Sequence, residues 1–425
     1  MKTQYILSEY SDDIILPDYE LTVEEREYLT EISIVNESRP WEKRFYFDEL
    51  RNGLRIRTQS WVGVIELDQA RIIIQPKFNK GFTSLTEMMA FAEEWPLYRK
   101  QYTSGELEST NLLEILVRLF LQEVDLIIGR GFFKEYVTER NNLRQIRGKV
   151  DFRRNMKHNF NLPVRVYCEY DEFVTNIVEN QVLLTVLSTV SRLPLQKDTK
   201  QQLNILRSQL EQICQEYKGT NWPSFHYHRL NAHYEQAHKL GEYLWKRLSA
   251  STFFERHTFY YSFLIDMNEL FEKFIVQLLR KYLPRTYKVH HGKRVTKAIL
   301  CNGDSYRYII PDIVVENKQI RQMVVLDVKY KQYGKRKVEN SDIYQLAFYA
   351  QYYSNGHNED YGASIIYPKY KEDLIQENSL LLNGGTSYQG ILHIKAVSIE
   401  EVLYAVAKRD LKWLGSVALN IVGRK

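Results

Sequence analysis

The order of apolar and polar residues near the N-terminus is typical of β-structure. Residues 61–67 and 70–76 form two largely apolar runs separated by the short turn Asp68-Gln69, which predicts a β-hairpin. Shorter apolar runs predict further strands over 32–35 and 54–57. The N-terminal region is therefore predicted to be rich in β-strands.

Helical spacing of apolar residues dominates the middle of the chain. Leu112, Leu116 and Phe120 belong to one such series, over residues 111–128. Similar patterns predict helices over 84–95, 176–217 and 231–248, with a break at Pro194. We expect these helices to form a scaffold.

From residue 263 the pattern changes to helix, strands, helix and strand. The elements predicted there are a helix over 263–276, buried strands over 308–315 and 323–330, a helix over 341–350, strands over 364–367 and 391–395, and a final helix near 399–414. These elements predict a mixed sheet covered by helices.

The resulting fold class is a multidomain α+β protein. We predict an N-terminal β-rich partner-binding domain over residues 1–110 and a mainly helical middle domain over 111–255. An α/β domain with a mixed central sheet is predicted over 256–425. At 425 residues the chain is too long for one compact core, which agrees with several domains.

Composition excludes several classes of protein. No apolar run approaches the roughly 18 residues that a membrane-spanning helix needs, so no membrane partner is expected. The first residues lack a secretory signal pattern, and a cytoplasmic location is expected. The three cysteines, Cys168, Cys214 and Cys301, are too few and too widely spaced for a disulfide framework or a CxxC zinc site.

Charge is distributed unevenly, although the net charge is only +5. Residues 1–31 contain nine acids and two basic residues, a balance that would repel DNA. Residues 143–165 show the opposite bias and form either a polyanion contact or, alternatively, a solvated face or an interface to an acidic partner. The candidate DNA contacts in this stretch are Arg144, Arg147, Lys149, Arg153 and Arg154.

Four histidines, His226, His228, His233 and His238, lie within thirteen positions. This density raises the possibility of a metal site. No cysteine or tight carboxylate set accompanies them, and core or solvent-facing histidines are the commoner outcome. We therefore do not predict a metal there.

Charged residues inside the apolar runs of the C-terminal region predict a catalytic site. Asp312 lies within one predicted strand, and Asp327 and Lys329 lie two positions apart on the next, so the latter two share a face. Burying such charges is costly unless they are paired or used. The alternative is a salt bridge that holds two strands together, but buried ion pairs are poor stabilisers.

Two close carboxylates favour a hard divalent cation, and Mg²⁺ commonly takes one or two carboxylates while it keeps sites for water and substrate phosphate. A lysine beside them can orient an attacking water or stabilise charge on a phosphate. The pattern therefore predicts Mg²⁺-dependent phosphodiester hydrolysis by Asp312, Asp327 and Lys329, with the two aspartates as metal ligands.

Nearby residues supply further candidates. Gln345 and Tyr349 are four positions apart on the predicted helix, so both can reach one cleft, although ordinary helix packing explains them nearly as well. Lys331, Lys335 and Arg336 follow the motif and either contact DNA phosphates or belong to a solvated loop.

The order of these residues resembles the PD-(D/E)xK nuclease superfamily with its QxxxY extension. Pro311-Asp312 would supply the first motif, Asp327-x-Lys329 the second, and Gln345-x-x-x-Tyr349 the helical one. The resemblance implies that Gln345 and Tyr349 take part in the catalytic site. It also implies a metal contact from Glu272 on the preceding helix.

Most of the chain resembles the McrC family, the nuclease subunits of McrBC modification-dependent restriction systems. The stretches that carry this resemblance are 62–65 with 72–77, Arg147-Gly148-Lys149 with 170–173, and 266–272. It implies an endonuclease that cuts double-stranded DNA, docks onto an oligomeric McrB-like AAA+ GTPase and stimulates GTP hydrolysis by that partner. No GxxxxGK[ST] phosphate loop occurs, so the chain itself should not hydrolyse GTP.

Two other functions stay open. The chain could be a non-catalytic activator or scaffold of the motor, whose N-terminal domain enters or caps the ring. It could also be a stand-alone repair or recombination nuclease, which would cut DNA with Mg²⁺ and no nucleotide.

Overall fold

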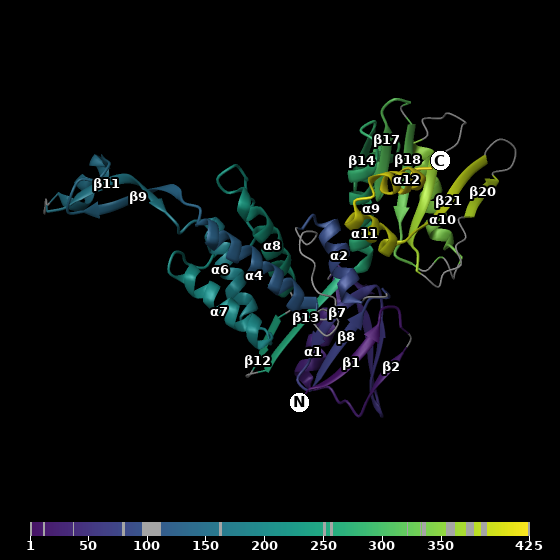
Figure 1. Ribbon diagram of the computed structural model, residues 1–425, viewed down its shortest axis with the longest axis horizontal. Helices are drawn as coiled ribbons and strands as arrows, with labels where there is room; N and C mark the ends of the chain where they lie inside the picture. Colours follow the sequence, from purple (N-terminus) through teal and green to yellow (C-terminus); the bar gives the residue numbers. More distant parts are fainter. Residues whose placement is uncertain are drawn as a thin grey trace. The chain divides into compact units, whose positions relative to one another are not determined.

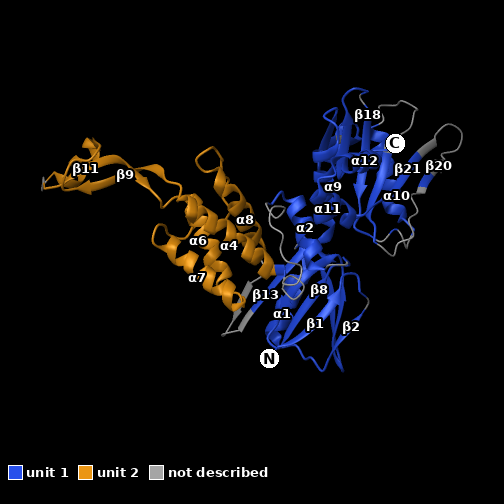
Figure 2. Ribbon diagram, in the orientation of Figure 1, with its two compact units in different colours: residues 1–112, 251–425 blue, residues 113–250 orange. Residues whose placement is uncertain are grey.

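The computed structural model describes residues 2–423 except 12, 37, 79–80, 96–111, 161–163, 250–251, 256–257, 321, 332, 334–336, 354–361, 371–377 and 384–388. It is a mixed α/β chain with several sheets, and it forms two compact units (Figure 2). Unit 1 comprises residues 1–112 and 251–425, and unit 2 comprises 113–250. The segments predicted as first and third domains thus share one unit, while the three-domain division stays a prediction.

The first sheet of unit 1 joins strands from two distant parts of the sequence. Its order is β1 (Thr3–Ser8), β8 (Ala70–Gln75), β7 (Trp61–Glu66), β13 (Thr258–Asp266) and β12 (Thr252–Glu255). The predicted hairpin is confirmed, because β7 and β8 pair antiparallel. The helix predicted from residue 263 is wrong at its start, since 263–266 belong to β13 and pair with β7.

Gly63 permits the close pairing of β7 and β13. Its φ is 143°, and a Cβ at this position would lie 1.9 Å from the carbonyl oxygen of Phe263. Only glycine tolerates both the backbone conformation and this approach. The strand therefore depends on a glycine in the middle of an apolar run.

Smaller elements complete the N-terminal part of unit 1. They are β2 (Ile14–Pro17), β5 (Phe45–Leu50) and β6 (Gly53–Thr58) in one sheet, β3 (Ile34–Asn36) and β4 (Arg39–Lys43) in another, and the helices α1 (Val23–Ser33) and α2 (Phe82–Ala92). The strand predicted over 32–35 is only half correct, because Ile32 and Ser33 end α1. Thr22 and Glu25 form a capping box that fixes where α1 begins.

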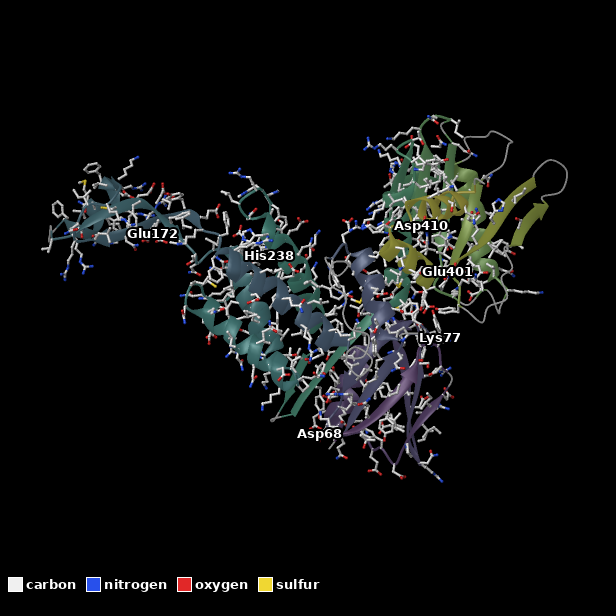
Figure 3. The ribbon with its side chains drawn as sticks, in the orientation of Figure 1. Asp68, Lys77, Glu172, His238, Glu401 and Asp410 are labelled. Atoms are coloured by element: carbon white, nitrogen blue, oxygen red, sulfur yellow. The ribbon has the colours of Figure 1, made fainter. Side chains whose placement is uncertain are left out.

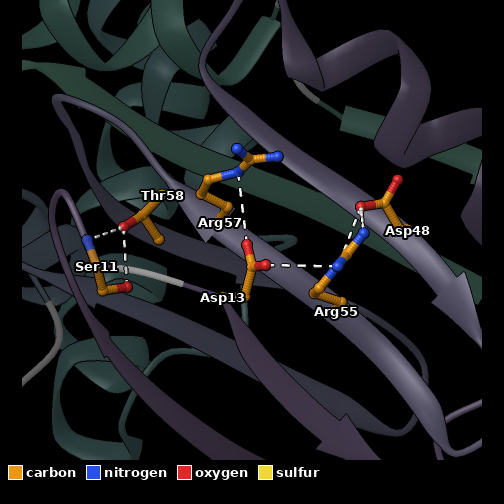
Figure 4. Close-up of polar contacts among 6 residues, drawn as sticks. All are labelled: Ser11, Asp13, Asp48, Arg55, Arg57 and Thr58. Carbon is orange, nitrogen blue, oxygen red and sulfur yellow. Dashed lines mark hydrogen bonds and ion pairs between the residues drawn. The ribbon is translucent and has the colours of Figure 1, made fainter.

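Basic side chains pair with part of the acidic N-terminal charge (Figure 4). Arg55 lies 2.6 Å from Asp48 and 3.4 Å from Asp13, and Arg57 lies 3.5 Å from Asp13. These pairs are exposed and contribute little to stability. They reduce the negative field that the sequence alone suggests.

Unit 2 combines the predicted helices with an unpredicted sheet. The helices are α4 (Leu112–Arg130), α6 (Val178–Val190), α7 (Lys197–Glu211) and α8 (Glu235–Ser249), with a 3₁₀ turn η2 (Ala232–Tyr234). The sheet contains β9 (Glu135–Leu143), β10 (Lys149–Val150) and β11 (Val166–Val174), with helix α5 (Phe152–Asn159) beside β11. The middle region thus contains a small sheet beside its helices, which the sequence pattern did not predict.

The C-terminal part of unit 1 contains a mixed sheet, as predicted. The order of its six described strands is β14 (Tyr287–His291), β17 (Ile313–Asn317), β18 (Gln322–Val328), β19 (Gly362–Pro368), β21 (Gln389–Val397) and β20 (Asn378–Asn383). Parallel pairing joins β18 to β19 and β19 to β21. A separate hairpin is formed by β15 (Val295–Cys301) and β16 (Asp304–Ile309).

Helices pack around this sheet (Figure 1). They are α9 (Met267–Tyr282), α10 (Asn340–Tyr353), α11 (Ile399–Lys408) and α12 (Leu411–Ile421). Leu346 and Tyr349 of α10 pack against Val325 of β18 and Ile365 of β19 in one apolar cluster. Among the described residues, no helix has the length and apolar character needed to cross a membrane.

Candidate active site

Asp312 and Asp327 occupy neighbouring positions on adjacent strands. Ile313 is paired with Leu326 in the antiparallel register of β17 and β18, so Asp312, one residue earlier, lies beside Asp327. The backbone N–H of Val328 donates to Asp312 Oδ2 over 2.9 Å. This bond fixes the Asp312 side chain at the C-terminal end of β18.

Lys329 lies beside Asp327 on the same face of the sheet. It lies one residue beyond β18, but its N–H donates to the carbonyl of Ile366 over 2.9 Å and prolongs the pairing with β19. Its Nζ lies 3.1 Å from Asp327 Oδ1. Because alternate strand residues share a face, Asp327 and Lys329 lie on the face that carries Val325. The structure thus brings together all three residues of the predicted site.

The first of the two strands differs from the prediction. The run 308–315 is not one strand, because β16 ends at Ile309 in the separate hairpin and β17 begins at Ile313. Pro311 falls in the break, where its missing N–H interrupts no ladder. Asp312 therefore lies at the start of a sheet strand and not in its interior.

Burial disfavours the charged forms of the Asp312 and Asp327 carboxylates, and their contacts offset this only in part. Asp327 is 1% exposed, and neither of its oxygens accepts a hydrogen bond of good geometry among the described residues. Burial raises the pKa of Asp327, and the ammonium of Lys329 offsets this only in part. Burial also raises the pKa of Asp312, again against the opposing effect of Lys329. Burial thus disfavours the charged forms of both aspartates more than the ammonium of Lys329 favours them.

Glu272 and His291 extend the site on the side of α9. The Nε2 of His291, the last residue of β14, lies 2.7 Å from Glu272 Oε1. Burial, followed by the charge of Asp312, raises the pKa of the Glu272 carboxyl, and His291 opposes this shift. Glu272 therefore lies in the field of Asp312, as a third carboxylate of the site.

Gln345 and Tyr349 contact each other on α10. The Nε2 of Gln345 donates to the hydroxyl oxygen of Tyr349 over 3.0 Å. Tyr349 is buried in the apolar cluster that includes Val325, so α10 covers the sheet face on which Asp327 lies. No described contact joins either side chain to Asp312, Asp327 or Lys329, and their catalytic role stays a prediction.

Two residues that follow Lys329, Lys331 and Tyr333, contact Asp342 of α10. Lys331 Nζ lies 3.0 Å from Asp342 and 3.0 Å from Glu339, and the hydroxyl of Tyr333 donates to Asp342. Burial would raise the pKa of Asp342, but the bonds from Tyr333 and Lys331 outweigh it and lower the pKa. Lys331 is thus ion-paired, while Lys335 and Arg336 lie outside the described residues.

The basic stretch of the middle region lies on and beside the sheet of unit 2. Arg147 lies over the ring of Tyr170 and 3.3 Å from Glu172, which is labelled in Figure 3. Arg154 lies over the ring of Tyr167 and 3.6 Å from Asp151. The members that the structure leaves exposed, with no contact described for their charged groups, are Arg144, Lys149 and Arg153.

His238, also labelled in Figure 3, is a core histidine of unit 2. Its ring nitrogens lie 3.1 Å from the Tyr227 hydroxyl and 2.9 Å from the carbonyl oxygen of Glu179. Burial lowers its pKa to about 4, so the ring is neutral near pH 7. The packing of His238 is explained without a ligand.

The residues present fit a hard cation that needs few protein ligands. Within the described part of the chain, no three Asp, Glu, His or Cys side chains form a complete metal-binding group. Mg²⁺ needs only one or two carboxylates, because water and substrate phosphate complete its octahedron. Asp312 and the unsatisfied oxygens of Asp327 provide such a pair, and Glu272 is near enough to influence it electrostatically.

Sequence reasoning missed two residues that act on the site electrostatically, His291 and Asp342. His291 precedes a glycine at the end of an edge strand and belongs to no motif. Asp342 lies in the first turn of α10, where an acid is expected for helix stability alone. Only the pairing of β14 with β17 places His291 next to Asp312.

Comparison with known proteins identifies the family. The family model for the McrBC 5-methylcytosine restriction system component matches residues 56–368. No curated protein matches the sequence.

Two solved structures from Thermococcus gammatolerans match this chain. One is described as a refined half-complex from a tetradecameric assembly of McrB AAA+ hexamers with bound McrC. The match has a TM-score of 0.66 and 18% identity, and covers 98% of this chain and 100% of that chain. The other is the cryo-EM structure of the McrBC complex, with a TM-score of 0.47 and 19% identity over 67% of this chain and 89% of that chain. Because the family model covers well over half of the sequence, the chain belongs to the McrBC family of 5-methylcytosine restriction system components.

Proposed function

We propose that this chain is the DNA endonuclease of a McrBC-type restriction complex and that it hydrolyses phosphodiester bonds with Mg²⁺. The observation that carries the proposal is the pairing of half-buried Asp312 with buried Asp327 on adjacent strands. Neither Asp327 oxygen accepts a hydrogen bond of good geometry among the described residues, and Lys329 Nζ lies 3.1 Å from Oδ1. A structural salt bridge would need one carboxylate. Two carboxylates facing one ammonium favour a bound divalent cation.

In this proposal Asp312 and Asp327 hold Mg²⁺, and Glu272 supports it from α9. When bound, the ion would supply Lewis-acid chemistry that stabilises negative charge on a phosphoryl oxygen. His291 restrains the Glu272 carboxyl through their 2.7 Å contact. Asp312 is held in place for this task by the N–H of Val328.

Lys329 contributes a fixed positive charge beside the scissile phosphate. The Asp327 and Asp312 carboxylates outweigh the effect of burial and raise the pKa of Lys329, so its ammonium stays protonated. A protonated lysine cannot act as a base, but it can orient the attacking water and stabilise charge that develops on the phosphate. Its 21% exposed side chain leaves access from solvent.

The order of the elements supports a PD-(D/E)xK arrangement. Helix α9 with Glu272 precedes β17 and β18 with the aspartates, and α10 with Gln345 and Tyr349 follows. Gln345 is held by Tyr349 over the same sheet face as Asp327. We propose that Gln345 orients water or a phosphate there, with Tyr349 as its support.

The partner in this proposal is an oligomeric McrB-like AAA+ GTPase. The support is family membership together with the likeness to a solved chain from an assembly of McrB AAA+ hexamers with bound McrC. The lack of a phosphate loop in this sequence assigns nucleotide hydrolysis to the partner. The chain's own contribution would be cleavage of double-stranded DNA and stimulation of that hydrolysis.

Further DNA contacts are proposed for exposed basic residues of unit 2. Arg144, Lys149 and Arg153 are exposed, whereas Arg147 and Arg154 are held by acids and tyrosine rings. Phosphate contacts of this kind would position the duplex without reading its sequence.

Plasmid cleavage by this chain together with a McrB-like AAA+ GTPase partner, GTP and Mg²⁺ tests the proposal. Asp327→Asn keeps the shape but removes the charge, and cleavage should fall by about 100-fold or more while stimulation of the partner's GTPase persists. The matched control is Asp410→Asn, because Asp410 caps α12 by accepting from the N–H of Trp413 and asparagine caps equally well.

Each alternative function predicts a different outcome. Cleavage by Asp327→Asn at the wild-type rate, or loss of cleavage and GTPase stimulation together in a folded variant, would refute the catalytic role. A wild-type chain that stimulates GTP hydrolysis but never cuts would be a non-catalytic activator. Rapid cutting by the isolated chain without nucleotide would identify a stand-alone nuclease.

A further inference from the structure

The hairpin β15–β16 is a separate element inserted between two strands of the mixed sheet. Its strands pair antiparallel through Cys301 and Asp304 at the tip. Asn302 and Gly303 form the turn, with φ values of 53° and 91°. Positive φ at both central residues is the geometry of the tight turns that join hairpin strands. The turn sequence therefore matches the hairpin that it closes.

Both ends of the hairpin are fixed at the candidate active site. His291, which contacts Glu272, precedes it, and Asp312 follows it. The N–H of Gly292 donates to the carbonyl of Asp312 over 3.0 Å, which joins the two ends. The hairpin thus begins after His291 and ends before Asp312, two residues of the proposed catalytic centre.

One side of the hairpin is anchored and the other is open. Ile309 is buried, and Val295 and Ala298 pack with it against the apolar cluster beneath α10. Tyr306 and Tyr308 alternate with the anchored residues and are 67% and 51% exposed. No described element packs on this open face.

Charge on the hairpin suits a polyanion. The sequence from 292 to 310 contains four basic residues and one acid, Asp304. Lys293, Arg294 and Arg307 are exposed. The guanidinium of Arg294 lies 3.9 Å from the centre of the Tyr308 ring, and this stacking holds it on the open face.

We propose that the open face of the β15–β16 hairpin, formed by Arg294, Tyr306 and Tyr308, docks the DNA backbone next to the scissile phosphate. Arginine and tyrosine side chains are common donors to phosphate oxygens. A six-residue strand is about 20 Å long, which spans roughly six base-pair steps of duplex. The inference rests on the proposed function, because the same duplex must reach Asp312 and Asp327.

The occupant is assigned to DNA for two reasons. The positive charge of the hairpin complements phosphate. The two ends of the hairpin are also joined at Gly292 and Asp312, next to the site whose proposed substrate is DNA. A protein partner would equally bury two tyrosines, but it would not require a basic surplus directly beside the phosphodiester site.

The first test measures binding of the full-length protein to a fluorescein-labelled duplex in the presence of EDTA, so that no cleavage occurs. Arg294→Ala combined with Tyr308→Ala should weaken binding about tenfold and reduce the salt slope by about 1. The matched control is Lys408→Ala combined with Tyr404→Ala, another surface cation–ring pair, which lies on α11. Its affinity should equal that of the wild type.

The second test uses the exposed thiol at the tip of the hairpin. Cys301 is exposed, whereas Cys168 and Cys214 are buried, so a thiol-directed photo-crosslinker should attach at Cys301. Irradiation should join the labelled protein to the duplex, and Cys301→Ser should abolish the product. A folded double variant with wild-type affinity, or labelled Cys301 that yields no DNA adduct, overturns the inference.

These results separate the inference from the proposed function. If Asp327→Asn abolishes cleavage while the hairpin variant binds and cuts like the wild type, the active site stands and the hairpin inference fails. If the wild type never cuts but the hairpin variant loses affinity, DNA docking stands and the nuclease proposal fails. Loss of binding to the GTPase partner without loss of DNA affinity would make the hairpin a protein contact and refute the inference.

Discussion

The hydroxyl of Tyr330 donates a 2.8 Å hydrogen bond to Glu9 Oε1 across 321 positions of sequence. Tyr330 directly follows Lys329 of the candidate active site, and Glu9 follows β1 of the N-terminal sheet. Tyr10 adds a second link, because its hydroxyl donates to the Tyr330 carbonyl over 2.8 Å. The five-stranded and six-stranded sheets of unit 1 are thus joined next to Lys329 by the side chains of Glu9, Tyr10 and Tyr330.

Glu9 should make the stability of unit 1 depend on pH. Burial raises its pKa from 4.5 to about 7, against the opposing bonds from Lys77 and Tyr330. The folded state therefore holds a proton that the unfolded state releases, and the stabilisation present below pH 4.5 is lost as the pH rises through 7. Urea unfolding should show a decline of about 3 kcal/mol over this interval.

Glu9→Gln should remove that decline, because the amide cannot ionise but can still accept from Tyr330. The free energies of unfolding of variant and wild type should diverge as the pH rises from 4.5 to 7, in favour of the variant. A constant difference across this range would mean that Glu9 does not titrate there. Glu49→Gln, at an exposed acid of the same unit, is the control.

Tyr330→Phe should destabilise unit 1 by an amount that grows with pH. The ring keeps its packing against Phe271, but Glu9 loses a donor. Removing a donor from a neutral carboxyl costs about 1 kcal/mol, and about 2 to 3 kcal/mol when the buried carboxyl is charged. Urea unfolding at pH 5.5 and pH 8 measures both values, and equal costs would contradict the link. In the double variant with Glu9→Gln the pH dependence should vanish.

Mg²⁺ should raise the thermal unfolding midpoint of the wild-type chain. A cation that binds only the folded site stabilises it by about 2.7 kcal/mol at 100 times its dissociation constant. Asp327→Asn should abolish this shift. Without the cation, the variant should be at least as stable as the wild type, because it removes a buried charge beside Asp312. An equal Mg²⁺ shift in both proteins would place the cation elsewhere.

DNA binding by unit 2 can be tested by measuring how its affinity for DNA depends on salt concentration. If Arg144, Lys149 and Arg153 contact phosphates, replacing all three by glutamine should reduce the slope of log affinity against log salt by about 3. The matched triple variant replaces residues of the same sheet and helix whose guanidinium groups are ion-paired, namely Arg140, Arg147 and Arg154. It should change the slope less, and equal effects would argue for a diffuse basic surface.

Elements with a one-sided apolar pattern were predictable from the sequence. The periodic helices of unit 2 and the β7–β8 hairpin follow directly from such patterns. The charges at Asp312, Asp327 and Lys329 were found because they interrupt apolar runs. The pairing of β17 with β18 brings them together, even though Asp312 lies before a strand and Lys329 after one.

Other parts of the structure have no one-sided apolar pattern in the sequence. Strand β9 is largely exposed on both faces, so it lacks a buried stripe and cannot be recognised by alternation. The apolar run 263–276 contains a strand and a helix in succession, and its boundary is marked only by Asp266, which caps α9. The turn Asn302-Gly303 was a readable hairpin signal, but His291 gains its significance from pairing alone.

The pairing of β7 with β13 has a consequence for how this protein can be altered. Residues 113–250 are inserted between two segments of one sheet. Truncation after residue 255 would therefore remove β13, the neighbour of β7, and leave an unpaired strand edge that promotes aggregation. Excision or exchange of the insert as a whole would preserve that neighbour. Unit 2 can therefore change in length and surface while the sheets of unit 1 keep their pairing.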